Sequence, residues 1–167
     1  MGRPFATIVA LLVVLASACG GGDKTAVVNA KIPAGTVTSV ERVVDGDTIV
    51  VDGGTRVRFI GMDTPETKDP RKPVQCFGKA ASARTEQLLA KGTRIVLVYD
   101  VDRTDRYDRT LAYVYRASDA LFVNASLVRD GYAVAYTYPP DVAHADEFVA
   151  LQREARAAGR GLWSACR

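Results

Sequence analysis

Short runs of β-branched and apolar residues recur between residues 36 and 115. Runs of this length and composition are typical of β-strands. The break at Asp52-Gly53-Gly54 is typical of a tight hairpin, so the runs on either side of it are expected to pair antiparallel. The register of this hairpin would bring Asp47 and Asp63, at its two far ends, close together. The five predicted strands cover residues 36–44, 48–51, 55–62, 93–99 and 111–115.

Three further segments, residues 78–91, 123–130 and 144–158, have the composition of helices, and each stops at a glycine. In the last segment an apolar stripe predicts a helix packed on the core; its members are Phe148, Leu151, Ala155 and Ala158. The fold class predicted from the sequence is α+β: an OB-fold, with a five-stranded barrel and three helices. OB-folds bind oligonucleotides or oligosaccharides, so the fold alone does not choose between these ligands.

The first 18 residues have the pattern of a secretion signal, because an apolar run of 12 residues follows Arg3 and is followed by small residues. Two kinds of processing fit the junction. Ala16-Ser17-Ala18 fits ordinary signal cleavage, whereas Leu15 through Cys19 resembles a bacterial lipobox, in which Cys19 would be lipidated. Of these two, we favour the lipoprotein. A permanent anchor helix is a further alternative to a signal, but it would need about 20 apolar residues. Residues 19–35 would then form a flexible tether, and residues 36–167 the folded domain.

Export also affects the interpretation of the remaining cysteines. Cys76 and Cys166 would form a disulfide in an oxidising compartment, although two independent buried thiols are the alternative. Removing the signal lowers the basic residues from 22 to 21 against 19 acidic ones, a net charge of +2. Such a small net charge argues against a protein that permanently coats nucleic acid. It is compatible with an enzyme that must release its product.

Acidic and basic residues cluster around the predicted hairpin. Asp47, Asp63 and the backbone carbonyl of Thr64 offer the oxygen ligands that calcium prefers, with waters completing the set. Arg58 and Arg109 could hold a phosphate, because a guanidinium offers two parallel donors and stays charged at every relevant pH. A divalent ion and two arginines would make an acidic site attractive to a phosphodiester. The cluster therefore predicts metal-assisted attack of water on phosphorus.

Several separated blocks resemble the staphylococcal nuclease (thermonuclease) family, in the family's order and over essentially the whole of residues 36–163. The blocks are Val44-Asp45-Gly46-Asp47-Thr48, Arg58, Asp63-Thr64-Pro65-Glu66-Thr67, Arg103-Thr104-Asp105-Arg106-Tyr107-Asp108-Arg109 and Leu111-Ala112-Tyr113. The resemblance implies an OB-fold enzyme that uses Ca²⁺ to hydrolyse DNA and RNA with low sequence specificity and leaves 3′-phosphate ends. It identifies residues 36–167 as a nuclease-like domain.

The resemblance also implies a role for each matching position. Asp47 and Asp63 are similar to the carboxylate metal ligands and Thr64 to the carbonyl ligand. Arg58 and Arg109 are similar to the phosphate-binding pair, and Glu66 is similar to the residue that activates or orients the attacking water.

Four more positions resemble substrate-binding residues of the family. Arg106 and Tyr107 are similar to residues that contact a terminal phosphate, and Tyr136 and Tyr138 to aromatics that line the nucleotide pocket. Ordinary core or loop tyrosines are the alternative. Asp108 stands where the best-known member has glycine, so it either weakens the charge of the neighbouring arginine or shapes a turn.

A catalytically weak nucleic-acid-binding surface lipoprotein of the same fold is the main alternative function. The sequence argues against it because none of the five charged site residues is replaced. His144 is interpreted as an exposed start of a helix rather than a catalytic group. We expect a monomer outside the cytoplasm that uses DNA and RNA as substrates. It would be secreted or attached to the membrane by a lipid on Cys19.

Overall fold

The computed structural model describes residues 32–68 and 73–166 of the 167-residue chain. The predicted signal peptide, most of the tether and Cys19 lie outside these residues. The first described strand begins at Thr36, where the sequence predicts the folded domain to start.

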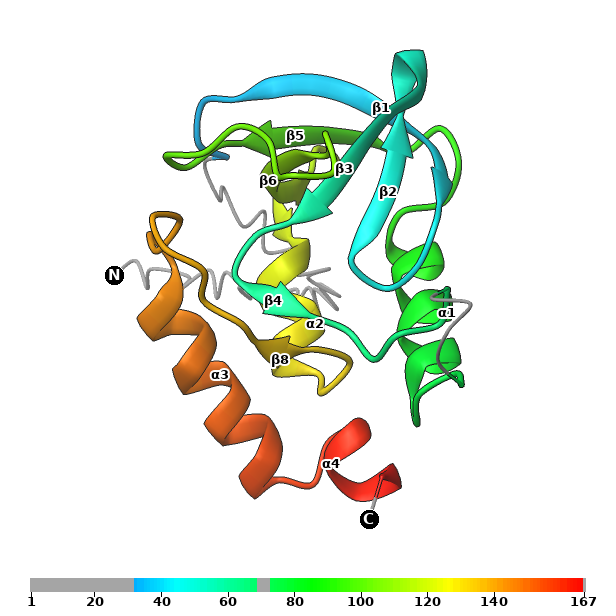
Figure 1. Ribbon diagram of the computed structural model, residues 1–167, viewed down its shortest axis with the longest axis vertical. Coiled ribbons are helices and arrows are strands. Elements are labelled where there is room, and N and C mark those ends of the chain that lie inside the picture. Colours follow the sequence, from blue (N-terminus) through cyan, green and yellow to red (C-terminus); the bar gives the residue numbers. More distant parts are fainter. Residues whose placement is uncertain (1–31, 69–72, 167) are drawn as a thin grey trace, which may run out of the picture.

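Five strands form a closed barrel (Figure 1). They are β1 (Thr36–Val43), β2 (Thr48–Val51), β3 (Thr55–Phe59), β5 (Arg94–Val98) and β6 (Thr110–Arg116). The pairs β1–β2, β2–β3, β1–β5 and β5–β6 are antiparallel, and a parallel pairing of β3 with β6 closes the barrel. A 3₁₀ turn, η1 (Asp52–Gly54), joins β2 to β3, and a short strand, β7 (Leu121–Phe122), pairs antiparallel with the end of β6. This arrangement confirms the predicted α+β class and the OB-fold.

The helices lie beside and below the barrel in Figure 1. They are α1 (Gly78–Leu88), α2 (Val123–Arg129), α3 (Ala145–Ala157) and α4 (Leu162–Ala165). The first three correspond to the predicted helices, and α4 is an additional single turn near the C-terminus. Phe148 and Ala155 of α3 are fully buried, as expected for the apolar stripe, while Leu151 is partly buried. The prediction is wrong for Ala158, which is exposed because it is the C-cap residue at the end of the helix.

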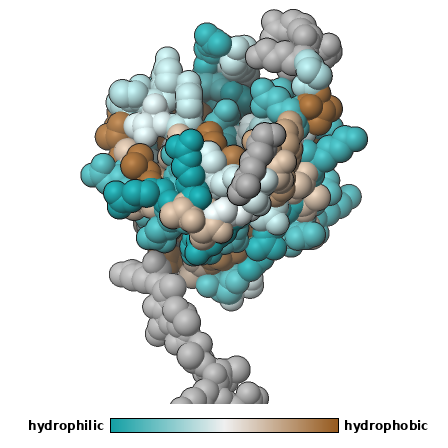
Figure 2. Space-filling model, turned by 90° about the horizontal axis from the view of Figure 1, so that it is seen from below, coloured by the Kyte–Doolittle hydropathy of each residue, from teal (hydrophilic) through white to brown (hydrophobic). Residues whose placement is uncertain are grey.

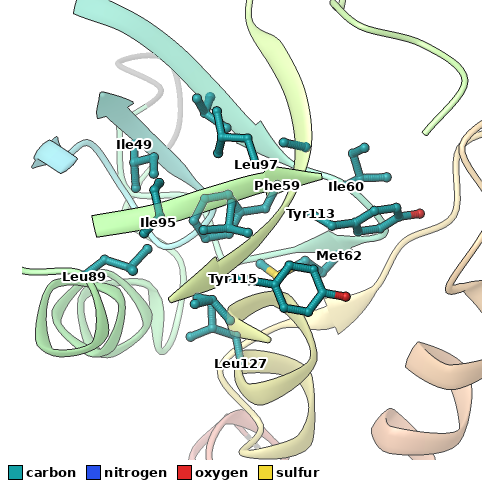
Figure 3. Close-up of a cluster of buried hydrophobic side chains, with 14 of the residues drawn as sticks. Ile49, Phe59, Ile60, Met62, Leu89, Ile95, Leu97, Tyr113, Tyr115 and Leu127 are labelled. Carbon is teal, nitrogen blue, oxygen red and sulfur yellow. The ribbon is translucent and has the colours of Figure 1, made fainter. Parts of the chain in front are cut away.

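The barrel interior is filled by alternate residues of its strands (Figure 3). Ile49, Val57, Phe59 and Ile95 are at most 1% exposed, whereas Arg56 faces solvent. This period of two follows from the geometry of a strand, which points successive side chains to opposite faces. Burying each large apolar side chain contributes roughly 1.5–3 kcal/mol. The packed barrel thus supports the loops at its rim.

The predicted strand over residues 55–62 is interrupted in the structure. Strand β3 ends at Phe59, and Gly61 adopts a left-handed conformation with φ of +77°. A Cβ at this glycine would lie 2.3 Å from the ring of Phe148, so only glycine fits the bend without movement of its neighbours. The chain then forms β4 (Met62–Asp63), which pairs antiparallel with β8 (Val134–Ala135). The bend therefore directs Asp63 back over the rim of the barrel.

Hydrophilic residues predominate on the face shown in Figure 2, and apolar residues occur there in small separate groups. Within residues 32–68 and 73–166, no helix is long and apolar enough to cross a bilayer.

Candidate active site

The turn between β1 and β2 contains the first two acidic residues of the site, Asp45 and Asp47. Thr48 pairs with Arg58 across β2 and β3, and the Phe59 amide donates to the Asp47 carbonyl at 2.9 Å. The buried hydroxyl of Thr85, on α1, donates to the Gly46 carbonyl at 2.7 Å. Strand pairing and this contact from α1 together fix the position of the turn.

Asp47 is buried and receives several hydrogen bonds. Its Oδ2 accepts from the amide and from the hydroxyl of Thr64, each at 2.9 Å, and its Oδ1 accepts from the Thr48 hydroxyl at 3.0 Å. The Nε atom of Arg58 lies 3.4 Å from the same Oδ1. Burial alone would raise the pKa of Asp47, but Arg58 and the Thr64 bonds outweigh it and lower the pKa. Asp47 is therefore held as a carboxylate.

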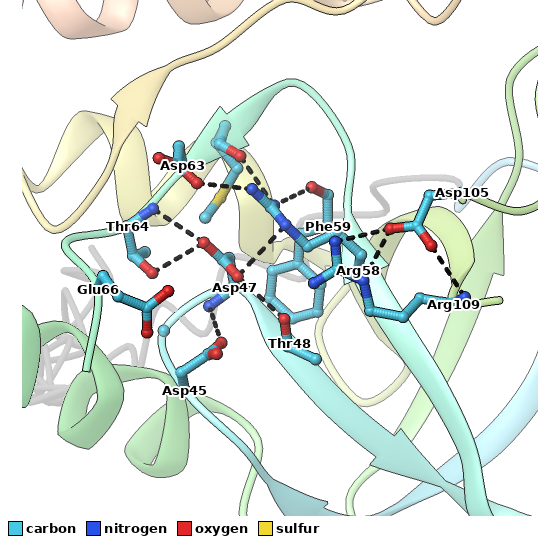
Figure 4. A network of polar contacts seen from close by, with 12 residues as sticks. Asp45, Asp47, Thr48, Arg58, Phe59, Asp63, Thr64, Glu66, Asp105 and Arg109 are labelled. Atoms are coloured by element: carbon cyan, nitrogen blue, oxygen red, sulfur yellow. Dashed lines mark hydrogen bonds and ion pairs between the residues drawn. The ribbon is translucent and has the colours of Figure 1, made fainter. Parts of the chain in front are cut away.

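Arg58 joins this carboxylate to the next strand (Figure 4). Its Nη1 donates to the carbonyls of Phe59 at 2.6 Å and Met62 at 2.9 Å, while Nη2 donates to Asp63 Oδ1 at 2.7 Å. The side chain is only 14% exposed. One guanidinium thus contacts both Asp47 and Asp63, which places the two carboxylates side by side as the hairpin predicts.

Negative charge accumulates on one side of Arg58 (Figure 4). Burial raises the pKa of Asp63, and the charges of Asp47 and Glu66 raise it further against the lowering effect of Arg58. Burial, followed by the charge of Asp47, raises the pKa of Asp45 to about 6. Mutual repulsion of this kind would be relieved by a bound cation.

The donors at this position are oxygens, which suits a hard cation such as calcium. They are the carboxylates of Asp47 and Asp63 and the carbonyl of Thr64. In the described part of the chain, no three Asp, Glu, His or Cys side chains come together as a potential metal site. The ligand set predicted from the sequence is two carboxylates, this carbonyl and water. These ligand assignments stay predictions.

Glu66 lies on the loop that follows β4. Its Oε1 accepts hydrogen bonds from the amides of Thr67 at 2.7 Å and of Lys68. Its own amide donates to Oε1 of Gln75 at 2.8 Å, and the Gln75 amide donates to the Glu66 carbonyl at 2.9 Å. The charge of Glu66 contributes to the raised pKa of Asp63, and Figure 4 shows its side chain on the same side of the network as Thr64 and Asp47.

Arg109 immediately precedes β6, the parallel neighbour of β3, and lies on the side of Arg58 away from most of the acids in Figure 4. It is paired with Asp105, whose Oδ2 accepts from Nε at 2.7 Å and lies 2.6 Å from Nη2. Asp105 Oδ1 also accepts from the amides of Arg109 at 3.0 Å and Tyr107 at 2.9 Å. Asp108 has a φ of +59°, so it occupies a left-handed turn position, where aspartate is tolerated.

The predicted substrate-binding tyrosines are all exposed: Tyr107 is 62%, Tyr136 53% and Tyr138 71% accessible. Arg106 lies over the ring of Tyr107 at 4.8 Å and donates to its hydroxyl at 2.7 Å. The Tyr136 amide donates to the Gly61 carbonyl at 2.9 Å, which places this residue beside the bend that carries Asp63. Exposed rings suit stacking with bases, and their role stays a prediction.

Two other predicted residues lie away from this network. In the structure, Cys76 and Cys166 form a disulfide across a separation of 90 residues. His144 is at the start of a helix, as the sequence predicts, but its side chain is half-buried rather than exposed. It is the N-cap residue of α3, where its ring packs against Tyr113 at 4.6 Å, and its Nδ1 lies 2.7 Å from Glu147.

The sequence analysis missed three supporting residues: Thr85, Gln75 and Asp105. Only Asp105 carried a readable signal, since an acid four residues before an arginine is a common ion pair. The side chains of Thr85 and Gln75 bond to backbone atoms of Gly46 and Glu66, which are distant in the sequence. Contacts of this kind depend on the fold and leave no pattern in the sequence.

Comparisons with known proteins identify the family of the chain. The family described as "Staphylococcal nuclease homologue" matches residues 56–165. Thermonuclease of Staphylococcus intermedius is 44% identical over 127 residues, which cover 74% of each protein. Thermonuclease of Staphylococcus hyicus is 40% identical over 128 residues, 75% of this chain and 74% of the relative. Endonuclease YncB of Bacillus subtilis (strain 168) is 40% identical over 131 residues, 75% of this chain and 61% of that protein. The chain therefore belongs to the staphylococcal nuclease family.

Proposed function

We propose that this protein is a calcium-dependent endonuclease that hydrolyses DNA and RNA with low sequence specificity and leaves 3′-phosphate ends. The observation that carries the proposal is the convergence of Asp47, Arg58, Asp63 and Thr64 in one network of contacts. The names of the relatives, thermonuclease and endonuclease, support hydrolysis of phosphodiester bonds.

The carboxylates of Asp47 and Asp63 and the carbonyl of Thr64 would hold the calcium ion. Bound there, calcium would supply the positive charge that polarises the phosphate oxygens. The acidic groups around Arg58 would otherwise repel a phosphodiester, so we expect substrate binding as well as turnover to depend on the ion.

The remaining charged residues would act on the substrate directly. Arg58 and Arg109 would hold the phosphate and stabilise the charge that builds up on it during attack. Glu66 would accept a proton from the attacking water, so that a new bond forms between this oxygen and phosphorus. The bond between phosphorus and O5′ then breaks, and the departing O5′ takes up a proton. The phosphate stays on the 3′ side.

Low specificity follows from the kind of groups that surround the site. Arginines contact phosphates, which are the same at every position of a nucleic acid. The exposed rings of Tyr107, Tyr136 and Tyr138 would stack on any base, at about 1–3 kcal/mol per base. We place Arg106 beside Tyr107 as a further phosphate contact.

We also propose that the protein acts outside the cytoplasm, with Cys19 lipidated as a membrane anchor, or in secreted form. The signal-like sequence before residue 19 supports this. A Cys76–Cys166 disulfide fits an oxidising compartment. We expect a monomer, and a single elution volume independent of protein concentration would test this.

Digestion of labelled DNA and RNA by the purified protein tests the function. We expect cleavage with calcium and none after a chelator is added. Glu66→Gln should lower kcat by about 10² to 10⁴-fold, the usual contribution of a general base. Glu86→Gln, which removes an exposed carboxylate from α1, is the matched control and should keep the parent rate.

Two results would contradict the proposal. Digestion that continues unchanged with chelator would refute the calcium requirement. Tight binding of nucleic acid with no cleavage under any metal condition would favour the alternative of a catalytically weak binding lipoprotein.

Release of phosphate from the products by a phosphatase specific for 3′ ends would identify the broken bond.

A further inference from the structure

Gln75 lies in the same connection between β4 and α1 as Glu66, and hydrogen bonds join the two residues. Two hydrogen bonds join them: the Glu66 amide donates to the Gln75 side chain at 2.8 Å, and the Gln75 amide donates to the Glu66 carbonyl at 2.9 Å. Together these contacts close a ring that fixes the backbone from which the Glu66 carboxylate extends. The position of this carboxylate relative to the metal ligands therefore depends on where Gln75 lies.

These hydrogen bonds are exposed to solvent, because Gln75 lies on the surface. Exposed hydrogen bonds exchange readily with water, and each contributes only about 0.5–1.5 kcal/mol. Two such bonds would not keep a loop in one position unless Gln75 were itself restrained. The structure contains two such restraints, one at the next residue, Cys76, and one at the start of α1.

The first restraint is the disulfide from Cys76 to Cys166, the residue that follows α4. Helix α4 is in turn fixed to the end of α2, since the Leu162 amide donates to the Gly131 carbonyl at 2.9 Å. A continuous path therefore leads from the body of the protein through α4 and the disulfide to Gln75.

The second restraint is the start of α1. Gly78 is buried against the Glu66 loop, and a Cβ at this position would lie 2.9 Å from the Pro65 carbonyl oxygen and 2.7 Å from the Thr67 side chain. Phe77, between Gly78 and the disulfide, packs on Tyr132 with ring centroids 5.3 Å apart. The turn that carries Gln75 is thus packed against the same loop that it hydrogen-bonds.

We propose that Gln75 is a positioning residue for Glu66, and that the Cys76–Cys166 disulfide keeps Gln75 in place. This inference rests on the proposed function, in which Glu66 accepts the proton of the attacking water. It predicts that loss of either restraint lowers the rate of the chemical step. Metal binding by Asp47 and Asp63 should remain, because those residues are held by β2, β3 and β4.

The test is a double-mutant cycle on the full protein with saturating calcium and single-stranded DNA. Gln75→Met removes the side-chain acceptor and keeps the length of the side chain. We expect kcat to fall about tenfold from the displaced carboxylate. KM and the calcium dissociation constant should stay within about twofold of the parent. Gln87→Met, an exposed glutamine on α1, is the matched control and should keep the parent kcat.

The cycle separates positioning from a merely structural role. In a Glu66→Gln background, Gln75→Met should cause no further loss, because the group that it positions no longer takes a proton. An equal fold-loss in both backgrounds would overturn the proposal, and so would an unchanged kcat for Gln75→Met. Faster amide hydrogen exchange at Glu66 in Gln75→Met, with an unchanged circular dichroism spectrum, would support it independently of activity.

The disulfide is tested by Cys166→Ser and by treating the parent with a reductant. Both should lower kcat by a similar factor at a temperature where circular dichroism shows a folded protein. The reductant should have no further effect on Cys166→Ser. Full activity of Cys166→Ser would refute the role of the disulfide. If the parent protein does not cleave nucleic acid at all, the proposed function itself fails, and that result is distinct from each of these.

Discussion

The pair formed by Asp105 and Arg109 offers the sharpest test of how the site is built. Asp105 accepts hydrogen bonds from the Arg109 side chain and from two amides of the same turn. Asp105→Asn keeps the shape of the side chain but removes its charge and places an amide group against the guanidinium. The change therefore disturbs the orientation of Arg109 without creating a cavity.

The expected loss of stability follows from the contacts and their exposure. A hydrogen bond to a charged group contributes about 1.5–3 kcal/mol, and the lower end applies here because both side chains are partly open to solvent. We therefore expect Asp105→Asn to lower the free energy of unfolding at neutral pH by about 1–2 kcal/mol. The kcat should fall about tenfold, because a misdirected arginine stabilises the transition state less well.

The pH dependence of this difference has a definite sign. Burial would raise the pKa of Asp105, but the bonds from Arg109 and from the amides outweigh it and lower the pKa below 3.8. A lowered pKa means that the stabilisation is present above the unfolded-state pKa and is lost as pH falls through the folded-state pKa. The stability difference between the parent and Asp105→Asn should accordingly shrink in acid.

Asp108→Asn provides the matched control, since it removes the same charge from the same turn. Asn tolerates the left-handed conformation at this position. The free energy of unfolding of Asp108→Asn should therefore stay within about 0.5 kcal/mol of the parent value. Urea unfolding at several pH values and steady-state cleavage of DNA would measure both variants. If Asp105→Asn and Asp108→Asn were equally stable and equally active, the proposed control of Arg109 by Asp105 would be wrong.

Two further predictions concern other parts of the chain. Thr85→Val should lower the free energy of unfolding by about 1–3 kcal/mol, since it leaves the buried Gly46 carbonyl without its 2.7 Å donor. Thr85→Ser keeps the hydroxyl and should retain most of that stability in thermal unfolding, and equal stability of all three proteins would refute this account. The parent should partition into the membrane fraction of its host, while Cys19→Ala should not, because the thioether to lipid cannot form. Equal partition of the two would rule out the lipid anchor.

The fold and the centre of the site could be predicted because both depend on repeating patterns. The alternation around Val57 and Phe59 and the turn at Gly53 define a hairpin. A hairpin places its two ends together, which is why the proximity of Asp47 and Asp63 could be inferred. The Asp47, Arg58 and Asp63 network in the structure agrees with this inference.

The remaining features depend on contacts that have no period. The break at Gly61 is required by the ring of Phe148, 87 residues later in the chain, and no local signal marks it. The β4–β8 pair is only two residues long in each strand, too short for alternation to be visible. His144 packs against aromatic rings that are distant in sequence, so its partial burial depends on tertiary structure that a single sequence does not display.

The site is assembled from parts that are held in two different ways. Asp47 and Arg58 belong to the barrel itself, where burial and strand pairing fix their positions. Glu66 and Arg109 come from loops, and each is held by a neighbouring residue through hydrogen bonds that are partly open to solvent. Changes in the barrel should therefore affect metal binding and folding together. Changes in the neighbours of Glu66 and Arg109 should lower kcat and leave calcium affinity nearly unchanged, because they alter the approach of the reacting groups rather than the residues proposed to hold the ion.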